Sequence, residues 1–142
     1  IASTIGGMAF ISSNVGAVHA FAETVGAWFD TPHGVANSLF LPYIMEFNIP
    51  ACPERFADIA DAMGIEREES MSDEQYALKA VEYVKALNRK LNIPTIKEIK
   101  GITEERFEAI AERSANNVLS NDNARKITKE DYLELLKKAY NE

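Results

Sequence analysis

The chain has 142 residues, enough for one domain with a modest core, and its 46% hydrophobic and 26% charged residues are ordinary for a soluble globular protein. A net charge of −7 argues against a nucleic-acid binder, which would present a basic face to phosphates. The single cysteine, Cys52, excludes an internal disulfide, and because nothing indicates an oxidising compartment we expect a cytoplasmic protein.

Charge is distributed unevenly along the chain. Residues 1–50 contain no Lys or Arg and only three acids, a composition typical of an interior or an interface. The uncharged stretch from Ile1 to Ala22 is interrupted by polar residues and lacks basic flanks, so we expect neither a membrane span nor a signal peptide there. Since the first residue is Ile1 rather than Met, we expect the true N-terminus to lie upstream.

Helical patterns predict three elements in the charge-poor segment, over about residues 2–10, 14–29 and 32–47. Ser12 or Ser13 is expected to cap the second of these helices. Thr31 followed by Pro32 resembles a cap and a first helical residue for the third. Pro42 lies inside the third helix and should kink it, because proline removes a backbone donor and crowds the preceding turn.

The remainder of the chain has the pattern of ordinary amphipathic helices with solvated faces. Pro53 is expected to start a short helix that Gly64 ends, and Ser72 to Gln75 form a capping box for a long helix ending near Leu91. Thr103 and Thr128 are expected to cap the last two helices. No alternating strand pattern occurs, so the predicted fold class is all-α, with residues 1–142 forming a single helical domain.

The two histidines are the residues with the clearest potential for metal chemistry. His19 and His33 are 14 residues apart, which on one continuous helix would separate them by about 21 Å. A turn around Asp30–His33 would let them converge, and two neutral imidazoles in a charge-poor pocket would suit a divalent transition metal. From spacing alone, two unrelated core histidines are the favoured interpretation, because two ligands do not make a closed site.

The sequence motifs in segments Asn14–Gly26 and Asp30–Asn37 favour the metal-ligand interpretation of the histidines over that of unrelated core residues. Gly16, His19, Gly26 and the run Pro32-His33-Gly34 fall at the spacings of the signature of the iron-containing, group III alcohol dehydrogenases, which the chain therefore resembles. Further similarity to the family lies at Leu41-Pro42, Asn48, Cys52–Gly64, Leu87–Pro94 and Asn121–Arg125, so that effectively the whole chain is covered.

The resemblance implies a multi-helix domain like the C-terminal half of the iron-type (dehydroquinate synthase-like) helical domain. In that family an Asp and three His hold one Fe²⁺, and His19 and His33 match two of these ligands. The other two ligands, and the nucleotide-binding α/β domain, would lie before Ile1 and are absent here. The cofactors implied are Fe²⁺, with Zn²⁺ or another divalent metal as alternatives, and NAD or NADP; no residue of this chain is assigned to nicotinamide binding.

Glu23 is the notable departure from the family pattern, since many members carry a histidine there that is discussed as a proton carrier. Glu23 and Phe10 match positions that line the family's substrate pocket. The expected function is part of a metal-dependent alcohol dehydrogenase or aldehyde reductase acting on a small alcohol or aldehyde, with the fragment inactive alone and the full-length enzyme a homo-oligomer. The alternative is a non-catalytic helical packing or interaction domain with core histidines.

Overall fold

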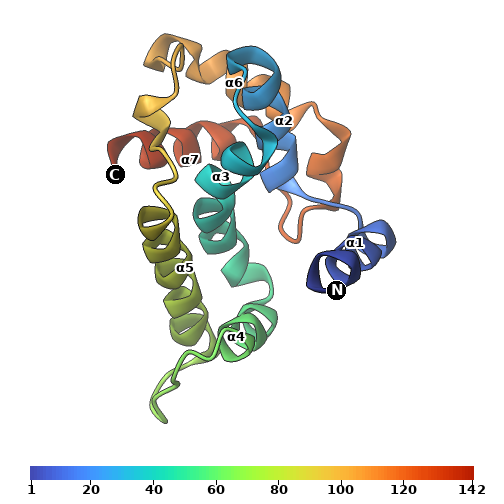
Figure 1. Cartoon of the computed structure of the whole chain (residues 1–142), viewed down its shortest axis with the longest axis vertical. Coiled ribbons are helices and arrows are strands. Elements are labelled where there is room, and N and C mark those ends of the chain that lie inside the picture. The colour runs from blue at the N-terminus through green and yellow to red at the C-terminus, as the bar shows by residue number, and fades with distance from the viewer.

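Helices account for all the regular secondary structure in the computed structural model, which describes residues 1–142 (Figure 1). The α-helices are α1 (Ala2–Ser13), α2 (Ala17–Phe29), α3 (His33–Asn48), α4 (Pro53–Ala62), α5 (Asp73–Lys90), α6 (Phe107–Ala115) and α7 (Lys129–Asn141). Four short 3₁₀ helices join them: η1 (Ile49–Ala51), η2 (Ile96–Glu98), η3 (Glu104–Arg106) and η4 (Val118–Asp122). The all-α prediction is confirmed.

Two packed cores hold these helices together. The larger core lies between α2, α3, α6 and α7, where the fully buried Phe21 contacts Phe40 and Tyr132. The smaller core lies between the end of α3, α4 and α5, around Met45 and Tyr76. Because α3 contributes side chains to both cores, its position fixes the two parts of the molecule relative to each other.

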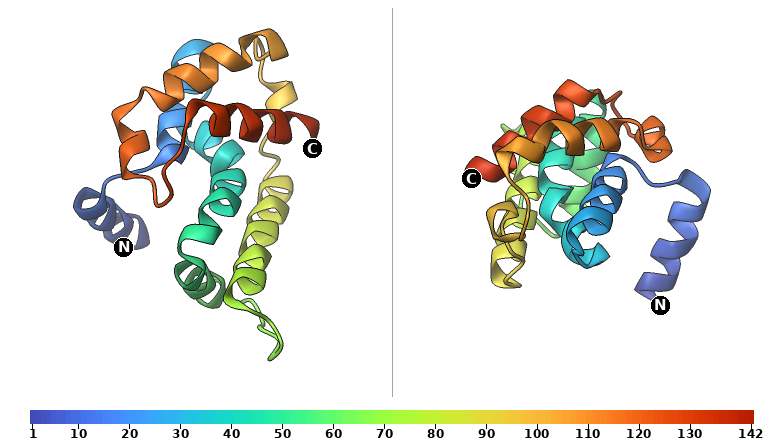
Figure 2. Two further views of the ribbon diagram at one scale, coloured as in Figure 1. Left: turned by 180° about the vertical axis from the view of Figure 1, so that it is seen from behind. Right: turned by 90° about the horizontal axis from the view of Figure 1, so that it is seen from above.

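Helix α1 stands apart from both cores. None of its residues is buried, and its large apolar side chains Ile5, Met8 and Ile11 are exposed. Figure 2 shows the helix projecting to one side of the remaining bundle. No single helix is long and apolar enough to cross a membrane; α1 and α2 pass such a test only when taken together, and they are bent by 105° at the break between them.

The break between α1 and α2 differs from the sequence-based expectation. Ser12 and Ser13 do not cap α2: they lie in the last turn of α1, where their hydroxyls donate to the carbonyls of Met8 and Ala9. Asn14 then adopts a positive φ of 57°, and α2 begins only at Ala17. The N-cap position of α2 is Gly16, three residues after Ser13, so the expected serine cap was wrong.

Capping in the second half follows the sequence closely. Ser72 accepts from the Gln75 amide, and the capping box predicted there is present. Thr128 accepts from the Asp131 amide and caps α7 as expected, within a second capping box. Thr103 is different, because it makes no side-chain cap bond and is followed by η3 rather than directly by α6. Pro42 lies inside α3, as expected, and the kink expected there stays a prediction.

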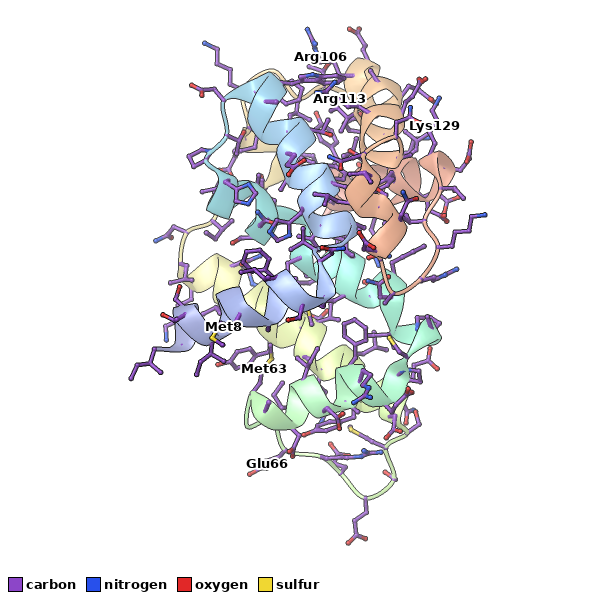
Figure 3. The ribbon with its side chains drawn as sticks, turned by 90° about the vertical axis from the view of Figure 1, so that its right-hand side faces the viewer. Met8, Met63, Glu66, Arg106, Arg113 and Lys129 are labelled. Atoms are coloured by element: carbon purple, nitrogen blue, oxygen red, sulfur yellow. The ribbon has the colours of Figure 1, made fainter.

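Helices α2 and α6 pack side by side at one end of the molecule. Trp28, the only tryptophan, is 40% exposed there, and the Arg113 guanidinium carbon lies 5.5 Å from its ring centre. Figure 3 shows Arg106 and Arg113 at this end, opposite the α4–α5 loop that carries Glu66. This cation–π contact therefore joins α6 to the end of α2.

Candidate metal centre

The two histidines lie next to each other at the junction of α2 and α3. His19 is the third residue of α2 and His33 the first residue of α3. Their ring centres are 5.3 Å apart, with the ring planes inclined by 54°. The structure therefore brings together the two residues that the sequence left 14 positions apart.

A tight turn produces this proximity. Asp30 ends α2 in the left-handed region, with φ 50° and ψ 37°, and Pro32 is extended immediately before His33. The turn folds back along α2 past Gly26, where an added Cβ would lie only 3.2 Å from the Thr31 carbonyl oxygen. Glycine at position 26 thus lets the turn approach α2 closely, which carries His33 back towards His19.

The geometry of the pair fits a shared metal ion. Two imidazoles whose nitrogens each lie about 2.1 Å from one tetrahedral ion would have ring centres about 5.3 Å apart. The pKa of His19 is lowered, first because burial disfavours the imidazolium and second because of the charge of His33, and these effects outweigh the opposing charge of Glu23. A lowered pKa favours the neutral imidazole, which is the form that binds metals.

Two ligands are all that this chain supplies at one place. No three His, Cys, Asp or Glu side chains come close enough together to hold an ion. A closed structural site needs four ligands, and a catalytic site usually has three from the protein. The pair therefore has the chemistry of a partial site that other donors must complete.

The histidines open onto a mostly apolar cavity of about 690 Å³. Side chains from α2, α3 and α4 line it, together with the loop at residues 122–124. Among the apolar lining residues are Val15, Val18, Leu41, Ile44, Ile59 and Met63. A cavity of this size, with apolar walls and a few convergent polar groups, is typical of a small-molecule site.

Asn37 adds one unsatisfied acceptor to the wall of this cavity. Its amide nitrogen donates to the His33 carbonyl one turn earlier at 2.9 Å, so the amide orientation is fixed. Its Oδ1 is the one buried side-chain polar atom of the structure that has no hydrogen-bond partner. Sequence analysis did not single out Asn37, although its spacing of four from His33 on a helix was the available signal.

Glu23 and Phe10 do not line the cavity. Glu23 is exposed one turn beyond His19, and its Oε2 accepts a 2.8 Å hydrogen bond from the side-chain amide of Asn117. Phe10 lies on α1 and is 52% exposed. Their place in a substrate pocket stays a prediction.

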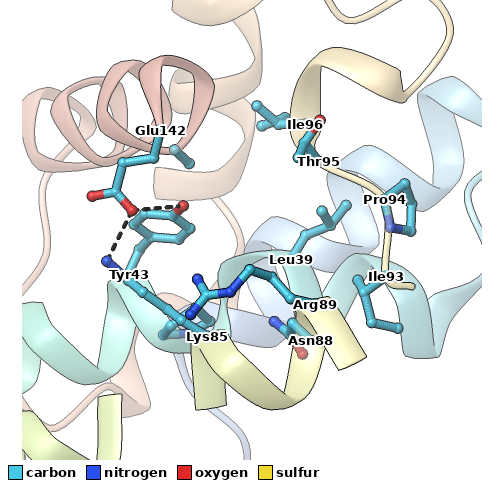
Figure 4. A pocket seen from close by; sticks show the side chains of 12 residues that line it. Leu39, Tyr43, Lys85, Asn88, Arg89, Ile93, Pro94, Thr95, Ile96 and Glu142 are labelled. Atoms are coloured by element: carbon cyan, nitrogen blue, oxygen red, sulfur yellow. Dashed lines mark hydrogen bonds and ion pairs between the residues drawn. The ribbon is translucent and has the colours of Figure 1, made fainter. Parts of the chain in front are cut away.

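A second, smaller cavity of about 160 Å³ lies between α3, α5 and α7 (Figure 4). Two of its charged groups pair with each other, because the Glu142 carboxylate accepts from Lys85 Nζ at 2.8 Å, and the same carboxylate accepts from the Tyr43 hydroxyl at 3.3 Å. Burial and the neighbouring Glu142 raise the pKa of Tyr43 to about 12. This polar cluster ties three helices together and leaves the histidine cavity as the candidate site.

The comparisons with known proteins agree with the fold. Residues 1–140 match the model of the Fe-containing alcohol dehydrogenase family, C-terminal. The chain belongs to this family. It is 39% identical over 136 residues to lactaldehyde reductase of Escherichia coli K12, and 36% identical over 139 residues to 1,3-propanediol dehydrogenase of Citrobacter freundii. These alignments cover 96% and 98% of the chain but only 35% and 36% of the relatives.

Solved structures of this family have the same helical arrangement. An alcohol dehydrogenase from Oenococcus oeni superposes with a TM-score of 0.88 at 41% identity, covering 94% of this chain and 35% of that one. The iron-containing alcohol dehydrogenase from Thermococcus thioreducens gives 0.84 at 32% identity, covering 99% and 35%. The family resemblance and the helical fold expected from the sequence are thus confirmed, and the chain spans about a third of its relatives' length.

Proposed function

We propose that the chain is the C-terminal part of an NAD(P)-linked alcohol dehydrogenase or aldehyde reductase, in which His19 and His33 are two ligands of a catalytic divalent metal such as Fe²⁺. The observation that carries this proposal is the pair of imidazoles 5.3 Å apart on the wall of a 690 Å³ cavity. Membership of the iron-containing alcohol dehydrogenase family supports it.

The role of this chain's own residues would be to bind the metal and to orient the substrate. Neutral nitrogens of His19 and His33 would hold the metal, which is favoured by the lowered pKa of His19. When bound, the metal would supply Lewis acidity toward an alcohol or aldehyde oxygen, and the nicotinamide would carry the hydride. Apolar residues such as Val18 and Leu41 would exclude water and contact the carbon chain of the substrate.

We infer that further ligands and the nicotinamide site come from the rest of the enzyme, since this chain covers about 35% of its relatives and gathers only two ligands. The nucleotide itself stays open, because one relative is named an NADPH-dependent butanol dehydrogenase and another an NAD-dependent methanol dehydrogenase. The isolated chain is accordingly expected to lack hydride transfer. Robust aldehyde reduction by the purified 142-residue chain with Fe²⁺ and NADH or NADPH would contradict the inference that the rest of the enzyme supplies these ligands and the nicotinamide site.

A chimaera tests the proposal more fully. In it, this chain replaces the matching C-terminal part of lactaldehyde reductase from Escherichia coli K12. We expect aldehyde reduction that depends on added metal, and we expect both His19→Ala and His33→Ala to lose bound metal and turnover together. Lys100→Ala, at an exposed position without an ion pair, is the control that should change neither. Histidine variants that keep wild-type metal content and rate would overturn the proposal.

A further inference from the structure

Two asparagine side chains form a reciprocal amide pair beside the candidate metal centre. Asn48 Nδ2 donates to Asn123 Oδ1 at 3.1 Å, and Asn123 Nδ2 donates to Asn48 Oδ1 at 2.7 Å. Each asparagine amide carries both the N–H donor and the carbonyl acceptor that this arrangement needs. The pair joins residues 75 positions apart, and Asn48 is buried.

The same amide pair holds the start of α2. Gly16 has no side chain to cap this helix, and Asn123 Oδ1 instead accepts from the Ala17 backbone amide at 3.3 Å. A Cβ on Gly16 would lie 3.0 Å from that oxygen and 3.2 Å from the Asn123 Cα, so the two segments are in close contact. The capping function of α2 is therefore supplied from 106 residues further along the chain.

The loop that carries Asn123 is fastened to the end of α3. Asn123 Nδ2 donates to the Arg125 carbonyl at 2.7 Å, and Arg125 Nη1 donates to the Phe47 carbonyl at 3.0 Å. The Arg125 guanidinium also lies 4.2 Å from the Phe47 ring centre. These contacts hold the Asn123 amide in one orientation between the start of α2 and the end of α3.

The position of the amide pair relates it to the histidines. Helix α2 starts at Ala17 and carries His19 two residues later, whereas α3 starts with His33 and ends with Asn48. The turn past Gly26 links the C-terminal end of α2 to the start of α3, and the amide pair links the start of α2 to the end of α3. Both ligand helices are thus fixed to each other at two separate places.

We propose that Asn48 and Asn123 are positioning residues that set the separation of His19 and His33 and so the affinity for metal. This rests on the proposed function of the histidine pair. A site must be held within about 0.5 Å of its productive geometry, and losing a group that orients metal ligands typically lowers metal affinity about 10- to 100-fold. Removing the amide pair frees the start of α2, and with it the backbone that carries His19.

The variants separate positioning from stability. Asn123→Ala removes every bond of the pair, whereas Asn123→Asp keeps an acceptor for Ala17 and Asn48 but loses both donors. Thr128→Ala is the matched control, because it removes the cap of α7 and destabilises the fold without touching the pair. All are compared with wild type at a temperature at which circular dichroism shows each protein folded.

The first readout is the Co²⁺ affinity of each variant in the chimaera with lactaldehyde reductase, which supplies the remaining ligands, measured by competition with a chromophoric chelator. We expect binding about tenfold weaker for Asn123→Ala, an intermediate loss for Asn123→Asp, and wild-type affinity for Thr128→Ala. Wild-type affinity in Asn123→Ala, together with lower stability, would show a structural role alone and overturn the inference.

The second readout does not depend on metal. Nuclear Overhauser contacts between the His19 and His33 rings in the metal-free chain should weaken in Asn123→Ala and persist in Thr128→Ala. If the wild-type chimaera shows no Co²⁺ binding that depends on His19 and His33, the proposed function fails, and the ring contacts in the metal-free chain still test the positioning role. If instead the contacts persist unchanged in Asn123→Ala and Asn123→Asp, the positioning inference fails and the proposed function is unaffected.

Discussion

Gly16 lies against Asn123 so closely that a methyl group has little room. Gly16→Ala would place a Cβ 3.0 Å from Asn123 Oδ1 and 3.2 Å from its Cα, and the backbone contact cannot relax through a rotamer. We expect a loss of about 1–3 kcal/mol in the free energy of unfolding, measured by urea denaturation.

Gly34→Ala provides the comparison for this prediction. Nothing lies within 4 Å of an added Cβ at Gly34, which is in the first turn of α3. This change should stabilise the chain slightly, by up to about 1 kcal/mol, because alanine favours the helix. Equal stability of the two alanine variants would show that the Asn123 loop moves away at no cost.

His19 gives the fold a dependence on pH. In the folded chain the pKa of His19 lies below its ordinary value of 6.5, first because of burial and second because of the charge of His33. The charge of Glu23 raises this pKa but does not outweigh the other two effects. The unfolded chain therefore takes up a proton at higher pH than the folded chain does. The free energy of unfolding should fall as the pH drops below 6.5 towards the lowered value, and His19 should contribute no slope above 6.5.

Urea denaturation of wild type and His19→Gln at several pH values on either side of 6.5 checks this dependence. Subtracting one curve of unfolding free energy against pH from the other removes the contribution of the carboxylates, which is common to both proteins. The difference should slope below pH 6.5 in metal-free buffer, with wild type losing the more stability. A flat difference would mean that His19 has the same pKa in the folded and unfolded chains.

At the scale of elements, the helix caps predict unequal effects of similar threonine changes. Thr128→Ala removes the hydroxyl that accepts from the Asp131 amide and donates to the Asp131 carboxylate, whereas the backbone amide of residue 128 keeps its own bond to that carboxylate. It should cost about 1 kcal/mol in the free energy of unfolding. Thr103→Ala removes no cap bond and should cost under about 0.5 kcal/mol. Thermal denaturation of both variants checks the difference, and equal losses would contradict it.

The elements that were predictable are those whose signals are local. Capping boxes at Ser72 and Thr128 depend on residues three apart, so the sequence located the starts of α5 and α7 correctly. The start of α2 was misplaced because its acceptor is Asn123, which is distant in the chain. Likewise, the serines before it bond backwards within α1, a choice that nearby sequence does not reveal.

At the scale of the whole molecule, α1 should be the least stable element of the isolated chain. It buries no residue, whereas α2 contributes Phe21 and Val25 to the larger core. Backbone amides of α1 should exchange with deuterium near the rate of an unfolded chain, and amides of α2 should approach the protection of global unfolding. Mass spectrometry of the exchanged peptides checks this. Equal protection of both helices would show that α1 packs on the bundle.

The candidate site was only partly predictable at this scale. The family signature named His19 and His33, and the structure brings their rings together. The spacing of the two histidines alone could not predict that their rings meet, since this depends on the turn at Asp30 and its close approach to Gly26. The contacts of Asn48 with Asn123 join distant segments, and no periodicity along the chain encodes such a pair.

The only tryptophan, Trp28, lies in contact with Arg113 and can serve as an intrinsic fluorescence probe. Because every photon of tryptophan emission comes from Trp28, the spectrum reports one place, the end of α2 where α6 docks. That helix also carries His19. Fluorescence of the unlabelled chain can therefore follow α2 directly, both during unfolding and on adding metal.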